Sequence, residues 1–246
     1  MKLLPVLLIT LIIAFGCNKE QKTSSTGENK KDTIANQQNN SQTKSDPQNA
    51  NNNNVENNSS SLTNIEYGIS KLPPILKNYD GKIVAMAKWE DKLGRNVLFI
   101  TETEEKGGDN RHKELYGYHY LISDEENKQV WKINDFIKDC PVDLTLKYID
   151  KSISITDLDK NGVGESLFLY RMACKGDVSP DDMKLIMHEG ETKYAIRGTM
   201  RLEISGEKPF GGEMKIDASF DKAPKEFVDF AKEQWNKFVL DKIGSY

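Results

Sequence analysis

The sequence predicts a mainly β domain: an antiparallel meander, sandwich-like or blade-like, followed by a C-terminal amphipathic helix (α+β). Two observations lead to this prediction. Short runs of β-branched and aromatic residues recur roughly every ten positions between polar turns, a spacing typical of antiparallel strands. The end of the chain changes to the 3.6-residue apolar period of a helix. No sequence repeat of propeller length is apparent, so separate blades are not predicted.

The chain begins with features of an export signal. A positively charged N-terminus precedes the apolar run 3–15, which is too short for a comfortable membrane span. The run ends in Ala-Phe-Gly before Cys17, which resembles a bacterial lipobox, although Phe15 is larger than the residue usual there. We therefore expect residues 1–16 to be a lipoprotein signal peptide and Cys17 to be lipidated, with an ordinary signal peptide as the alternative. The expected location is the bacterial cell envelope, anchored to the outer membrane or cell surface through the lipid.

The next segment has the composition of a disordered tether. Residues 17–62 are dominated by Asn, Gln, Ser, Lys and Thr, and residues 51–54 are all Asn. Such a chain cannot bury enough apolar surface to offset the entropy of ordering it. We interpret it as a spacer that carries a single globular domain, residues 63–246, away from the membrane.

Charge and cysteine content narrow the class of protein further. The formal net charge is −4, so nucleic acid is not an expected partner. With Cys17 assigned to the lipid, Cys140 and Cys174 remain, and an even number of cysteines in an exported protein suggests a disulfide. Two free buried thiols are the alternative.

The predicted strands follow from alternation and turn signals. A hairpin is expected from residues 82–89 and 96–103, because Asp-Lys-Leu-Gly at 91–94 is a turn sequence. The further strands are predicted at 115–123, 129–137, 144–149, 152–156, 166–172, 183–188, 194–204 and 214–220.

The strand at 115–123 is rich in aromatic residues. Tyr116, Tyr118 and Tyr120 alternate with other residues and therefore share one face. With Trp131 expected nearby, they form either a platform on which a sugar stacks or a face that packs beneath another layer. The second arrangement is the more common one for such a face.

The C-terminal helix is predicted at residues 224–243. Its apolar residues form one stripe, Asp221 is placed to cap its N-terminus, and Pro224 suits the first turn. Its polar face carries acidic as well as basic residues, which favours packing on the sheet over binding to a lipid surface.

One acidic loop has the spacing of a calcium site. The expected oxygen ligands are Asp157, Asp159, Asn161, the carbonyl of Val163 and Glu165. Gly162 allows the sharp turn that such loops need, but Phe168 stands where an EF-hand has its bidentate Glu. The flanking runs are also strand-like, so the loop is closer to the Asp-rich calcium loops between strands of integrin-type propellers. The alternative is a hairpin whose Asp and Asn side chains only support the turn.

No catalytic constellation is evident, and whether the protein is an enzyme is left open. His112, His119 and His188 lie far apart without the spacing of zinc ligands. The sequence also contains no Gly-x-Ser-x-Gly motif and no phosphate-binding glycine loop.

The region from 156 to 198 resembles a family of flavobacterial-type envelope lipoproteins labelled as surface-polysaccharide (lipopolysaccharide) biosynthesis proteins. The similar stretches are Asp-Leu-Asp-Lys-Asn-Gly-Val-Gly-Glu from Asp157, Leu-Phe-Leu-Tyr-Arg from Leu167, and Met-Lys-Leu-Ile-Met-His-Glu-Gly from Met183. The resemblance implies a non-enzymatic envelope lipoprotein that binds or helps to assemble surface polysaccharide. A lipoprotein that binds an envelope protein and a calcium-dependent enzyme that acts on glycans are the alternatives. No catalytic residue is carried over.

Overall fold

The computed structural model describes residues 62–72 and 76–243. The predicted signal peptide, the lipidation site Cys17 and the predicted tether up to residue 61 lie outside the described residues. Within the two described ranges, no helix combines the length and the apolar character needed to span a bilayer.

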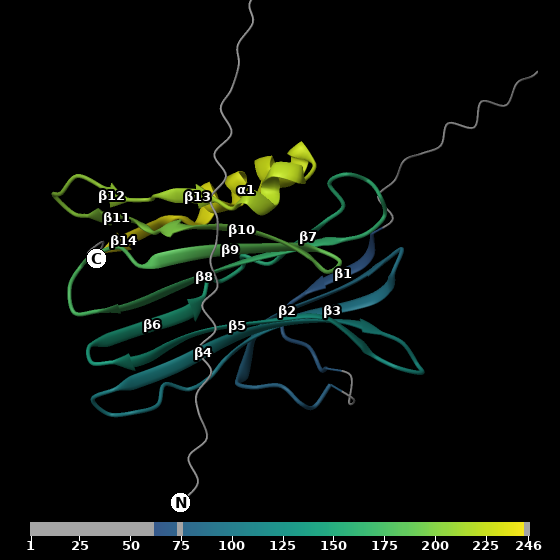
Figure 1. The fold of residues 1–246 in the computed structure, drawn as a ribbon, viewed down its shortest axis with the longest axis horizontal. Helices are drawn as coiled ribbons and strands as arrows, with labels where there is room; N and C mark the ends of the chain where they lie inside the picture. Colours follow the sequence, from purple (N-terminus) through teal and green to yellow (C-terminus); the bar gives the residue numbers. More distant parts are fainter. Residues whose placement is uncertain (1–61, 73–75, 244–246) are drawn as a thin grey trace, which may run out of the picture. The chain divides into compact units, whose positions relative to one another are not determined.

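The first part of the described chain folds into a five-stranded antiparallel sheet with its strands in sequence order (Figure 1). Its strands are β1 (Thr63–Tyr67), β2 (Lys82–Asp91), β3 (Gly94–Glu102), β4 (Arg111–Ile122) and β5 (Lys128–Cys140). The predicted hairpin is confirmed as β2 and β3. Its turn needs Gly94, which has a φ of 123°, and Asp91 supports it by accepting a hydrogen bond from the Leu93 N–H at 2.8 Å.

A second antiparallel sheet follows, and it carries the acidic loop. Its strands are β6 (Asp143–Tyr148), β7 (Ser154–Thr156), β8 (Glu165–Lys175), β9 (Asp182–Glu189), β10 (Thr192–Thr199) and β13 (Met214–Ile216). In the described chain their order is β13-β10-β9-β8-β6, and β7 pairs with the other end of β8. The prediction of a mainly β, antiparallel domain is therefore confirmed.

The predicted strand at 194–204 is in fact two strands in different sheets. β10 ends at Thr199, and β11 (Arg201–Ile204) pairs with β12 (Phe210–Gly211) and with β14 (Leu240–Ile243). The Met200 N–H still donates to the carbonyl of Asp181 at 2.8 Å, which extends the β9–β10 ladder by one position. The chain changes partners at Arg201, whose N–H donates to the carbonyl of Val239 at 2.7 Å. The pairing of β11 with β14 is parallel, unlike the rest of the fold.

The predicted C-terminal helix is confirmed as α1 (Lys225–Phe238), but its predicted N-cap and its predicted C-terminal end are wrong. Asp221 is not the N-cap, because it lies in the 3-10 helix η1 (Ala218–Lys222). This 3-10 helix also replaces the end of the strand predicted at 214–220. Pro224 precedes the first turn of α1. The predicted residues 240–243 form β14, because their backbone pairs with β11. The apolar side of α1 is buried on the outer face of the second sheet, as the packing interpretation expects.

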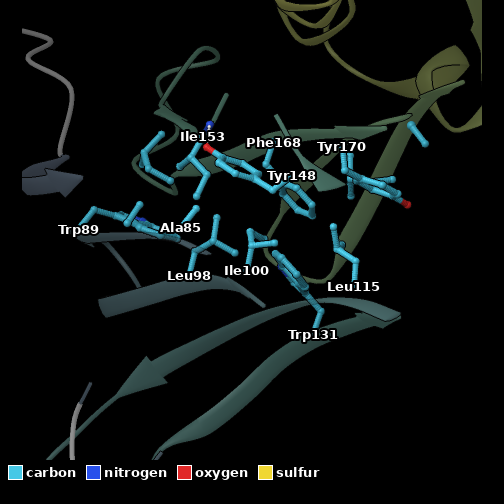
Figure 2. Packing of buried hydrophobic residues seen from close by; sticks show 14 of the residues in the cluster. Ala85, Trp89, Leu98, Ile100, Leu115, Trp131, Tyr148, Ile153, Phe168 and Tyr170 are labelled. Atoms are coloured by element: carbon cyan, nitrogen blue, oxygen red, sulfur yellow. Dashed lines mark hydrogen bonds between the residues drawn. The ribbon is translucent and has the colours of Figure 1, made fainter. Parts of the chain in front are cut away.

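The two large sheets face each other across the main core of the domain (Figure 2). Trp89, Leu98 and Ile100 of the first sheet meet Tyr148, Phe168 and Tyr170 of the second in this layer. The outer face of each sheet is also apolar. The helix covers one, and the segment around Leu76 and Tyr79 covers the other. Alternate side chains of a strand thus enter different cores, which is why the strands read as nearly continuous apolar runs.

The tyrosine face lies on the outer side of the first sheet. Tyr116 and Tyr118 are buried there, with Tyr118 stacked on Phe99 at 4.9 Å between ring centroids. The prediction that Trp131 lies near these tyrosines is wrong. Trp131 pairs across the strands with His119, and both point to the core between the sheets, whereas Lys132 lies over the rings of Tyr116 and Tyr118. The sheet alternation places Trp131 on the opposite face.

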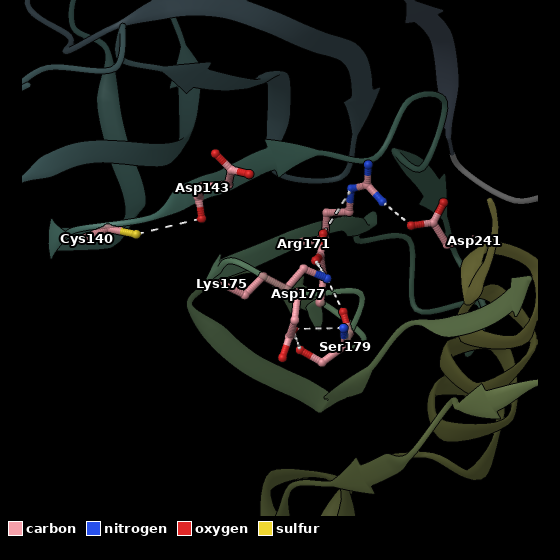
Figure 3. Close-up of polar contacts among 8 residues, drawn as sticks. Cys140, Asp143, Arg171, Lys175, Asp177, Ser179 and Asp241 are labelled. Carbon is pink, nitrogen blue, oxygen red and sulfur yellow. Dashed lines mark hydrogen bonds and ion pairs between the residues drawn. The ribbon is translucent and has the colours of Figure 1, made fainter. Parts of the chain in front are cut away.

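Cys140 and Cys174 are joined in the structure, with their Cα atoms 5.7 Å apart. Cys140 ends β5 of the first sheet and Cys174 lies in β8 of the second, so the bond ties the two sheets together. Near it on β8, Arg171 pairs with Asp181 at 3.6 Å and with Asp241 of β14 at 2.6 Å (Figure 3). The pair with Asp241 attaches the small third sheet to the second.

Candidate metal centre

The acidic loop connects β7 to β8 and brings three of the predicted ligands together. Asp157, Asp159 and Glu165 each offer a carboxylate oxygen, and these atoms lie within 4.8 Å of one another. Two oxygens that each bind one Ca²⁺ at about 2.4 Å can be at most about 4.8 Å apart. The spacing therefore fits a shared cation. Lys160 and Gly162 have positive φ values of 61° and 86°, which give the loop its sharp turn.

Glu165 is the deepest residue of the group. It is fully buried, and its Oε2 accepts hydrogen bonds from the Thr156 hydroxyl at 2.8 Å and from the Leu158 N–H at 3.0 Å. Its other oxygen, Oε1, is buried without a hydrogen-bond partner. Burial raises the pKa of Glu165 to about 7, and nearby Asp159 and Asp157 add to this shift. A bound cation would supply the missing partner of Oε1.

Asp157 repeats this arrangement with one satisfied and one unsatisfied oxygen. Its Oδ1 accepts a bond from the Gly162 N–H at 3.3 Å, whereas Oδ2 is buried without a partner. An unmatched buried acceptor costs about 1–3 kcal/mol, so two of them side by side are unfavourable unless something binds there.

The loop also contains the turn-supporting bonds of the alternative interpretation. The Asp159 carboxylate accepts from the Asn161 N–H at 3.1 Å, and Asn161 Oδ1 accepts from the Val163 N–H at 2.7 Å. Because Asn161 Oδ1 is bound to the backbone of Val163, the Asn161 side chain would have to rotate before this oxygen could bind a cation. Ligation by Asn161 and by the carbonyl of Val163 remains a prediction.

Two further carboxylates surround the loop, and sequence spacing does not point to either. Asp91 of β2 accepts bonds from the Gly164 N–H and the Trp89 indole N–H, both at 2.9 Å. Glu189 of β9 lies directly across from Glu165 and accepts a bond from the Asn161 amide. Among the described residues, no Lys, Arg or His forms an ion pair with any of these five carboxylates.

Asp91 makes the loop a contact between the two sheets. Asp91 accepts the bond from Gly164, and the N–H of the next residue, Lys92, donates to the carbonyl of Gly162 at 2.8 Å. Gly164 is required at this contact, because a Cβ there would lie 2.6 Å from Trp89 Nε1. A cation held by the loop would thus stiffen the junction of the sheets. Asp91 and Gly164 are 73 positions apart, so the sequence carries no local signal for their contact.

The structure also brings together two histidines that are distant in sequence. His188 stacks on Trp131 with ring centroids 4.1 Å apart, and His119 meets the same ring edge-on at 5.6 Å. Each has a buried Nδ1 without a partner, and His119 Nε2 lies 2.9 Å from Asn96 Oδ1. Burial lowers the pKa of His119 to about 4 and that of His188 to about 3. Both rings are therefore neutral parts of the core at pH 7.

Together these features define a β-sandwich protein with a candidate cation site where its two sheets meet. Comparisons with protein-family models, with curated proteins and with solved structures found no match. The functional argument therefore depends on the residues of the chain itself.

Proposed function

We propose that this chain is a lipid-anchored, non-enzymatic protein of the bacterial cell envelope that binds surface polysaccharide and is stabilised by Ca²⁺ in the Asp157–Glu165 loop. The observation that carries the calcium part is the pair of buried, unpartnered oxygens on Asp157 and Glu165. They face a cluster of carboxylates that no cationic side chain of the described chain neutralises.

Calcium is the cation that suits this site best. The donors are carboxylate oxygens on a loop, and Ca²⁺ accepts six to eight oxygens in flexible geometry. Mg²⁺ requires a tighter octahedron, and Zn²⁺ prefers nitrogen and sulfur donors. The loop donors come from the chain between two strands, so the role of the ion is to fix their junction.

A non-enzymatic role is supported by the state of the reactive side chains. Cys140 and Cys174 are joined, so neither is a free nucleophile. His119 and His188 are buried between the sheets and are unable to reach a substrate at the surface. The carboxylates of the loop are themselves the candidate ligands.

Attachment to the envelope and binding of polysaccharide are proposed from the sequence. The lipobox-like residues before Cys17 support the anchor, and the resemblance over residues 156–198 supports a surface glycan as the ligand. The test is retention of surface polysaccharide, purified from the producing bacterium, on the immobilised full chain but not on the heat-unfolded chain. Retention of a protein instead, or cleavage of the glycan, would favour one of the two alternatives.

Calcium binding is tested separately by melting the full chain with 2 mM Ca²⁺ or with EDTA. If the Kd is about 0.1 mM, binding adds about 1.8 kcal/mol and raises Tm by about 4–7 °C. Asp157→Asn keeps the acceptor for Gly162 but removes the charge, and it should lose most of the shift. Asp109→Asn changes an exposed carboxylate outside the loop and should keep it. Equal Tm values of the wild type in Ca²⁺ and EDTA would refute the calcium site.

A further inference from the structure

We propose that the cavity between Tyr79, Tyr120 and the β4–β5 loop is a binding subsite for one pyranose unit that carries no negative charge. The cavity has a volume of about 290 Å³ and opens on the outer face of the first sheet. This inference rests on the proposed function, because it names the part of a polysaccharide that the protein would hold.

One side of the cavity is aromatic and held in place. Phe99 is fully buried at its base; its ring lies edge-on to Tyr79 at 5.3 Å and nearly parallel to Tyr120 at 6.1 Å. The Tyr120 hydroxyl donates to Gln129 Oε1 at 2.9 Å, which fixes the orientation of the ring. A preformed apolar wall of this kind suits the C–H face of a sugar ring.

The other side of the cavity offers hydrogen-bond acceptors. Asn127 lines it, and its side-chain oxygen Oδ1 is buried without a hydrogen-bond partner. Rotation of this side chain would bring the unsatisfied oxygen to a ligand hydroxyl. Glu125 and Glu126 also line the cavity, and in the described chain neither carboxylate forms an ion pair. Two hydrogen bonds close the loop: Ser123 Oγ accepts from the Glu126 N–H at 2.9 Å and donates to its carbonyl at 2.5 Å.

The aromatic side and the acceptor side of the cavity together determine which class of ligand fits. A sugar offers an apolar C–H face to the tyrosines and several O–H donors to the amide and carboxylate oxygens. The two unpaired carboxylates repel uronic acids and phosphorylated sugars, whereas a neutral or amino sugar is accepted. The cavity volume lies at the lower end of ligand pockets, which suits a single ring.

This subsite differs from the platform predicted from Tyr116, Tyr118 and Tyr120. Tyr116 and Tyr118 are buried under Lys132 and the segment around Asp80, and only Tyr120 of the three lines the cavity. The second tyrosine of the cavity is Tyr79, which lies outside the strand of Tyr120, so the alternation along that strand does not reveal it.

The test is saturation-transfer NMR on the full chain with three trisaccharides: isomaltotriose, which is neutral, chitosan trimer, which is cationic, and trigalacturonate, which is anionic. We expect transfer to the ring C–H protons of one of the first two and none to the third. Tyr120→Leu and Asn127→Ala should each weaken this binding on the order of tenfold, because each removes one favourable wall. Phe136→Leu, an exposed aromatic side chain of the same sheet outside the cavity, should leave it unchanged.

Melting curves of the variants show that each is folded before its affinity is compared. Tighter binding of trigalacturonate, or wild-type affinity in both cavity variants, would overturn the subsite. If the wild type retains surface polysaccharide but binds none of the trisaccharides, the subsite is wrong and the proposed function stands. If the wild type neither retains surface polysaccharide nor binds any of the trisaccharides, both proposals fail.

Discussion

Acid should destabilise this protein through His119 and His188. The rings are neutral and buried in the core between the sheets, and their pKa values in the folded state are about 4 and about 3, against 6.5 for an exposed histidine. Below pH 6.5 the unfolded chain therefore binds protons that the folded chain does not. The stability that the two neutral histidines contribute is fully present above pH 6.5 and is lost as the pH falls toward 4 and 3.

The size of the effect at pH 5 follows from the difference in proton binding. Both folded-state pKa values lie below 5, so the stability lost at pH 5 depends mainly on the histidine pKa of the unfolded chain. The free energy of unfolding falls by about 2 kcal/mol for each histidine. The charges that face the two rings do not change this direction. Asp91 raises the pKa of His119 by less than burial lowers it, whereas Lys193 and His119 lower that of His188 further.

Urea unfolding at pH 7.5 and at pH 5 measures this loss. The variant His188→Gln no longer titrates, so its loss of stability between the two pH values should be smaller than that of the wild type by about 2 kcal/mol. His112→Gln is the matched control, since His112 lies at the surface beside Glu114. If the wild type and His188→Gln lose equal stability, the burial argument is refuted.

Two further predictions concern the anchor and the disulfide. Cys17→Ser should release the protein from the membrane fraction, and globomycin should cause a larger precursor of the wild type to accumulate; unchanged fractionation of the variant would contradict the lipid anchor. A non-reduced digest should contain one linked peptide pair of Cys140 and Cys174, and Cys140→Ser with Cys174→Ser should lower the free energy of unfolding by about 3–4 kcal/mol, because the bond closes a loop across 34 positions. Two thiols that alkylate freely in the exported protein would refute the pairing.

The sequence by itself determined most of the longer elements of this fold, because strands and helices are encoded locally. Alternation predicted β2 to β9, and a 3.6-residue stripe predicted α1. The acidic spacing likewise indicated Asp157, Asp159 and Glu165, since one short loop contributes all three. Where the sequence prediction was wrong, as at residues 201–204 and 240–243, backbone pairing with a distant segment overrode the local pattern.

Only the tertiary structure decided which distant residues meet. It placed Asp91 against the acidic loop and both His119 and His188 against Trp131. It also brought Tyr79 and Tyr120 to one cavity. These contacts join different strands, sheets or loops, and no sequence period records how two sheets are stacked. Burial is also a property of the tertiary structure. The space between the two sheets excludes water and keeps both histidines neutral. Glu165 is buried on the other face of the second sheet, the face of Leu167 and Leu169, and its Oε1 is left without a partner there.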